Sequence, residues 1–174
     1  VVVDAVAQLV GPLVSAILPG LHDPEPVGHG LGIGSGTAAD LGTVLVVCGL
    51  VPLGEELLFR GVLVGSWIRA RRPAVGVAAS AVLFGLAHVT VGGRSMLVAA
   101  VLGAILAGAL LWSGSLGASV FAHCSINAIA LIGAGLHDPA PIALAVVVLV
   151  VTTLVATRLS PLVSWAPAAD TLPG

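Results

Sequence analysis

Long apolar stretches run through almost the whole sequence, and short segments rich in glycine and proline separate them. Only 8% of the 174 residues are charged, whereas a soluble globular domain carries about 25%. A water-soluble fold of this chain would lack the solvated groups that its surface needs, and the high hydrophobicity also excludes an intrinsically disordered chain. The sequence therefore predicts an all-α, multi-pass membrane protein that is surrounded by the lipid bilayer.

Six stretches are candidates for membrane-spanning helices, because the hydrocarbon core requires about 20 apolar residues per helix. The first is weakened by Asp4 and Gln8, and the second is interrupted by Pro52 and two consecutive glutamates. A loop rich in glycine and proline at 21–36 separates these two. The six stretches cover residues 1–19, 38–67, 73–91, 95–112, 116–135 and 142–157.

We expect one integral-membrane domain over residues 1–174, with its motif-bearing core at about 38–135 and a poorly ordered tail at 159–174. Arg69, Arg71 and Arg72 lie between the second and third stretches, and Arg158 ends the sixth. An even number of crossings puts all four on one side, which the positive-inside rule makes cytoplasmic. This predicts a protein of the cell membrane with both termini in the cytoplasm. The net charge of −2 provides no basic patch, so no nucleic-acid partner is expected.

Six polar side chains lie inside the predicted spans, where ionisable groups are costly unless they face a cavity or a partner. The second span contains three of them, the third contains one and the fifth contains two. With a rise of about 1.5 Å per residue, the three helices place all six in one layer about 10 Å thick. We therefore expect a polar cavity inside the helix bundle. The six residues are Glu55, Glu56, Arg60, His88, His123 and Asn127.

Helical phase predicts different surroundings for these side chains. Glu56 and Arg60 are four residues apart with the acid first, which favours an ion pair. Glu55 is rotated by about 100° from Glu56 and is the carboxylate left free for chemistry. His123 and Asn127 are also four residues apart and project from one face of their helix.

This set of groups suits the hydrolysis of a peptide bond within the membrane. A carboxylate can activate water, and histidine and asparagine can donate to a developing oxyanion. Two alternatives remain open: a zinc site with glutamate and histidine ligands and one open position, and a non-catalytic scaffold in which the polar groups only order the helices. Cys48 and Cys124 lie in apolar stretches, and we expect both to be small buried hydrophobic residues.

Three motifs resemble those of the CPBP family, which contains CAAX proteases and bacteriocin-processing enzymes and is also called the Abi family. The stretch PLGEELLFRG at 52–61 resembles the family's EExxxR motif. FGLAH at 84–88 resembles FxxxH, and HCSIN at 123–127 resembles HxxxN. Their order and spacing follow the family, and the resemblance covers residues 45–130.

The resemblance implies an intramembrane glutamic endopeptidase, similar to type II CAAX prenyl endopeptidases, that cleaves a peptide or a membrane-anchored protein. It implies that Glu55 and His123 activate the attacking water and that His88 and Asn127 form the oxyanion hole. Glu56 and Arg60 would support the site. Members of the family are regarded as metal-independent, so no cofactor is expected. Cleavage of prenylated proteins is not implied, because many bacterial members are linked instead to bacteriocin immunity or peptide maturation.

Overall fold

The computed structural model describes residue 16 and residues 36–160. Between residues 36 and 160 every regular element is a helix, as the composition predicts. The expected first span at 1–19, apart from Ala16, lies outside the described residues, as do most of the loop at 21–36 and the tail beyond Ser160.

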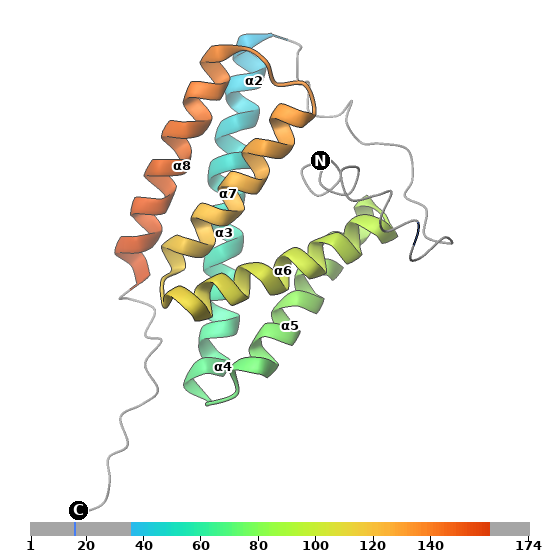
Figure 1. Ribbon diagram of the computed structural model, residues 1–174, viewed down its shortest axis with the longest axis vertical. Coiled ribbons are helices and arrows are strands. Elements are labelled where there is room, and N and C mark those ends of the chain that lie inside the picture. Colours follow the sequence, from blue (N-terminus) through green and yellow to red (C-terminus); the bar gives the residue numbers. More distant parts are fainter. Residues whose placement is uncertain (1–15, 17–35, 161–174) are drawn as a thin grey trace, which may run out of the picture.

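One continuous helix, Thr37–Arg69, runs along the length of the molecule in Figure 1. Two of its parts are π-helical, and the first of these directly precedes the segment that contains Pro52. Proline lacks an N–H and its ring clashes with the carbonyl four residues earlier, which is a common cause of such interruptions. In chain order the parts are α2 (Thr37–Val44), the π-helical η2 (Leu45–Leu50), α3 (Val51–Glu56), the π-helical η3 (Leu57–Val64) and α4 (Gly65–Arg69).

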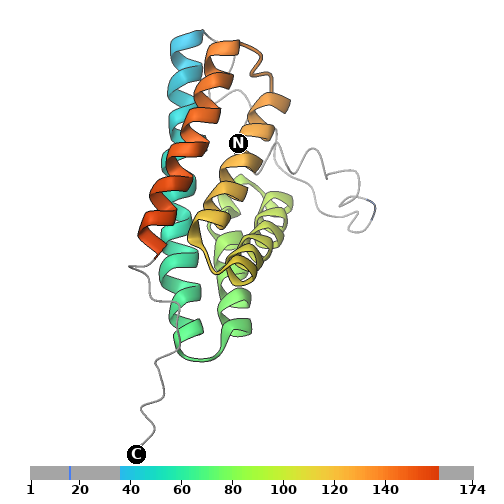
Figure 2. The same cartoon turned by 60° about the vertical axis from the view of Figure 1, so that its left-hand side comes forward.

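The remaining helices form two antiparallel pairs beside this long helix. After α4 the chain reverses into α5, and α6 returns alongside α5 (Figure 1). The helices α7 and α8 pack against each other and against the first half of the long helix, an arrangement that the second view also shows (Figure 2). The bounds are α5 (Pro73–Leu86), the short 3-10 helix η4 (Val89–Val91), α6 (Gly93–Ser113), α7 (Leu116–Gly133) and α8 (Pro139–Leu159).

Within residues 36–160, four helices are long and apolar enough to cross a membrane: Thr37–Arg69, α6, α7 and α8. The predicted helix at 73–91 is shorter than expected, because α5 ends at Leu86 after 14 residues. A short 3-10 turn comes next, and then Gly92 takes a φ of 127°, which disfavours any residue with a side chain. Hydropathy alone did not reveal this end, since the residues after Leu86 stay mostly apolar.

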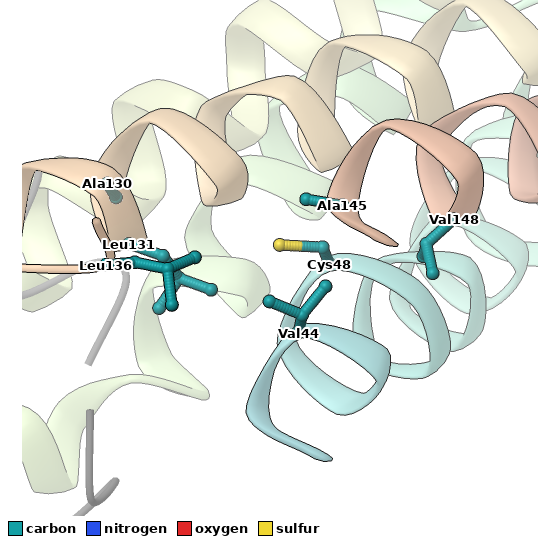
Figure 3. Close-up of a cluster of buried hydrophobic side chains, with 7 residues drawn as sticks. All are labelled: Val44, Cys48, Ala130, Leu131, Leu136, Ala145 and Val148. Carbon is teal, nitrogen blue, oxygen red and sulfur yellow. The ribbon is translucent and has the colours of Figure 1, made fainter. Parts of the chain in front are cut away.

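A buried apolar cluster joins α7 and α8 to the start of the long helix (Figure 3). Cys48 lies in it, and both cysteines are buried and free, as expected. A Cβ atom added to Gly49 would lie 2.8 Å from Cγ1 of Val148, so glycine allows α8 to approach η2 this closely. The cluster consists of Val44, Cys48, Ala130, Leu131, Leu136, Ala145 and Val148.

Glycines also set the distance between α5 and α6. A Cβ atom on Gly85 would lie 2.8 Å from the backbone oxygen of Met96 and 2.9 Å from the Cβ of Ala100. A Cβ atom on Gly103 would lie 3.1 Å from the Cα of Ala81. Membrane helices approach closely where small residues face each other, because their association depends on van der Waals packing rather than on a hydrophobic driving force. The contact brings the backbone of α6 near the polar side chains of the long helix.

We expect Gly85→Ala to destabilise the protein by about 1–3 kcal/mol, because the backbone of α6 would have to move. Thermal unfolding in detergent measures the change. Gly108→Ala on α6 is the matched control, since an added Cβ there meets no atom within 4 Å. Alanine in a helix is intrinsically better than glycine by about 0.5–1 kcal/mol. Equal stability of the two variants would contradict the close contact at Gly85.

Candidate active site

Glu56 is the centre of a buried hydrogen-bonded group. Its Oε1 accepts from Nη1 of Arg60 at 2.9 Å and lies 2.8 Å from Nδ1 of His123. Its Oε2 accepts from the hydroxyl of Ser119. The side chains of Glu56 and Arg60 are fully buried, so the ion pair expected from their spacing is present and is shielded from solvent.

Arg60 connects this carboxylate to two further helices. Its Nη2 donates to the backbone carbonyl of Gly103 on α6 at 2.9 Å. Its guanidinium carbon lies 4.8 Å from the ring centroid of Phe84 on α5, within the range of a cation–π contact. A buried guanidinium requires several partners, and these come from the long helix, α5 and α6 together.

His123 on α7 contacts both glutamates. Its Nε2 lies 3.6 Å from Oε2 of Glu55, while its Nδ1 faces Glu56. A carboxylate oxygen accepts hydrogen bonds, so Nδ1 donates to Glu56 and Nε2 is the ring nitrogen that faces Glu55. The side chain of Glu55 is 27% exposed and that of Glu56 is 0% exposed. Glu55 is thus the more accessible carboxylate, as the phase argument expects, although one imidazole reaches both.

His88 lies just after the end of α5 and joins the group through aromatic contacts. Its Nδ1 lies 2.8 Å from the carbonyl oxygen of Phe84, which accepts the hydrogen bond. Phe84 is in the last turn of α5, where carbonyl groups have no backbone donor within the helix. The ring centroids of Phe84 and His88 are 4.9 Å apart, and those of Phe84 and His123 are 5.8 Å apart.

Asn127 lies one helical turn after His123 on α7 and is 4% exposed. Its Nδ2 donates to the backbone carbonyl of Val47 in η2 at 2.7 Å. In the part of the chain that the structure describes, no hydrogen bond joins Asn127 to the other five predicted site residues. The structure thus connects Glu55, Glu56, Arg60 and His123 directly and places Asn127 against the π-helical segment.

Ser119 is a polar member of the site that the sequence prediction missed. It lies one turn before His123, so Ser119, His123 and Asn127 share one face of α7 at intervals of four residues. That periodicity was visible in the sequence, but a serine in a membrane helix commonly bonds its own backbone and is a weak signal. The hydroxyl of Ser119 also lies 3.0 Å from the carbonyl of Leu106, so it links α7 to α6.

The expected polar cavity around these residues stays a prediction. A cavity of about 410 Å³ opens elsewhere, between η2, α3 and α8, and Thr152 is the one polar side chain in its lining. None of the predicted site residues lines it. Over residues 36–160, no cluster of three or more His, Cys, Asp or Glu side chains is arranged to hold a metal ion.

We expect Glu56→Gln to destabilise the protein by about 3–5 kcal/mol, because it leaves the charge of Arg60 buried without its partner. Glu55→Gln is the matched control, since that side chain is partly exposed and its removal leaves the buried pair intact. Unfolding by denaturant in detergent micelles measures both. A similar loss of stability in the two variants would contradict the conclusion that Glu56, and not Glu55, is the buried partner of Arg60.

The chain matches one family model, described as type II CAAX prenyl endopeptidase Rce1-like, over residues 37–129. The match covers more than half of the chain and includes all six polar residues of the site. No curated protein and no solved structure matches the chain. The motifs, the apolar helices and the family match agree, and the protein belongs to the Rce1-like type II CAAX prenyl endopeptidase family, within the CPBP proteases.

Proposed function

We propose that this protein is an intramembrane endopeptidase that hydrolyses a peptide bond in a peptide or a membrane-anchored protein, with Glu55 and His123 activating the attacking water. The family match supports protease activity. The observation that carries the assignment of residues is the position of His123 between the two carboxylates, with Nδ1 on Glu56 and Nε2 facing Glu55. The buried acid orients the imidazole through Nδ1, so that Nε2 is directed towards Glu55.

In the proposed reaction, ionised Glu55 takes a proton from water while the water oxygen attacks the carbonyl carbon of the substrate. The electrons of the C=O bond move to the oxygen and give a tetrahedral oxyanion. When the oxyanion collapses, the C–N bond breaks and the leaving nitrogen takes up a proton from the Glu55–His123 pair. Glu56 keeps His123 oriented and is not itself consumed, since its oxygens accept from Arg60, His123 and Ser119.

Two donors are proposed to stabilise the oxyanion, as the family resemblance implies. Asn127 uses one amide hydrogen for Val47 and has a second amide hydrogen to donate. His88 bonds the carbonyl of Phe84 through its Nδ1, which leaves Nε2 as the ring nitrogen to interact with the oxyanion.

A non-catalytic scaffold or immunity partner is the alternative that the buried Glu56–Arg60 pair favours, because that pair would order the helices without any chemistry. A metal-dependent variant of the same protease is a further alternative. Substitution of Glu55 distinguishes the scaffold from the protease, because a scaffold needs Glu56 and Arg60 but tolerates changes at Glu55. Cleavage activity that survives strong chelators after metal-free purification argues against the metal-dependent variant.

We expect Glu55→Gln and His123→Ala to abolish cleavage by purified protein in detergent, assayed by mass spectrometry on a library of peptides and on lipid-anchored peptides. A loss of general-base catalysis alone is about 10²–10⁴-fold. Ser125→Ala is the matched control on α7, because the hydroxyl of Ser125 bonds the carbonyl of Phe121 in its own helix. Full activity of Glu55→Gln would overturn the proposed mechanism.

A further inference from the structure

Pro52 disturbs the hydrogen bonding of the long helix in a specific way. The N–H of Val51 donates to the carbonyl of Val46, five residues back, where an α-helix would have used Val47. In the same π-helical register, the backbone N–H of residue 52 would donate to the carbonyl of Val47. That residue is proline and has no N–H.

The carbonyl of Val47 therefore loses the donors that either helical register would give it. Inside a membrane there is no water to replace a missing donor, so an unpaired carbonyl is costly. Asn127 supplies the donor from α7: its Nδ2 lies 2.7 Å from the Val47 oxygen, and the residue is 4% exposed. The Asn127 side chain on α7 thus donates the hydrogen bond that Pro52 cannot give to Val47.

We propose that Asn127 is a positioning residue for Glu55, because its hydrogen bond to Val47 holds the π-helical segment η2 in place. A π-turn has the effect of one extra residue in an α-helix and rotates the remainder of the helix by about 100°. Glu55 lies three residues after Pro52. Loss of the π-turn would rotate Glu55 relative to the start of the long helix and move it away from His123. The consequence for cleavage rests on the proposed function, but the hydrogen bond and its effect on stability do not.

This role differs from that of an oxyanion-hole donor. A donor to the oxyanion acts on the substrate, so its loss lowers the rate and leaves the folded protein as stable as before. A donor to Val47 acts on the protein itself, and its importance depends on residue 52. With alanine at position 52, the N–H of residue 52 can donate to the Val47 carbonyl in the π-helical register. If the segment becomes α-helical instead, the N–H of Val51 can donate to the same carbonyl. The effects of Asn127 and Pro52 should therefore be coupled.

The experiment is a double-mutant cycle on the full chain in detergent, with the melting temperature Tm as the readout. Asn127→Ala should lower Tm by about 5 °C, the expected cost of one unpaired buried carbonyl. In the Pro52→Ala background the same change should lower Tm by less than half as much. An equal shift in both backgrounds, or no shift in either, would overturn the proposal.

Pro73 provides the matched control for proline. It occupies the start of α5, where a missing N–H leaves no carbonyl unpaired. In the Pro73→Ala background, Asn127→Ala should therefore lower Tm by the full amount. If Asn127→Ala does not fold, the double variant with Pro52→Ala should still purify as folded protein, and its failure would also contradict the proposal.

Cleavage kinetics separate positioning from direct catalysis. Asn127→Ala should reduce kcat by a smaller factor in the Pro52→Ala background than in the wild type, because the part of the loss that comes from a displaced Glu55 is then absent. An equal reduction in both backgrounds is what loss of an oxyanion-hole donor alone gives, and it would overturn the positioning role. The Tm measurements need no substrate. They therefore test the role of Asn127 even if the protein proves not to be a protease.

Discussion

The arrangement of helices depends on a buried ion pair between Glu56 and Arg60. Burying a pair of charges at membrane depth is costly unless most of its polar atoms have partners in the protein, because lipid tails cannot form hydrogen bonds. The partners come from three other helices: Gly103 from α6, Phe84 from α5, and His123 and Ser119 from α7. Four helices are thus tied to one interaction.

Such a pair is weak evidence for net stability, but its partners restrict how the helices can pack. Two charges lose their hydration on burial, and their mutual attraction only partly offsets that loss. An alternative packing in which α5, α6 or α7 shifted by a turn would separate the pair from Phe84, from Gly103, or from His123 and Ser119. The close approach of α5 and α6 at Gly85 and Gly103 serves the same end, since it brings the carbonyl of Gly103 within reach of Arg60.

Much of this could be predicted from the sequence because membrane helices obey simple rules. Scarcity of charge predicted the all-helical membrane class, and the interval of four residues predicted the Glu56–Arg60 pair. The predicted helix at 73–91 was too long, since the sequence after Leu86 remains apolar while the backbone turns away. Ser119 was missed because a serine in an apolar helix has several uses that its own sequence does not distinguish.

The sequence by itself determined which residues are polar within an apolar chain, the face of each helix on which they lie, and the family to which the chain belongs. Those properties are local, and helical periodicity expresses them directly. The tertiary structure alone decided which partners these residues take: that His123 contacts both glutamates, and that Asn127 donates to Val47. Partners of this kind lie on different helices, and their distances depend on how the helices pack, which no single segment encodes.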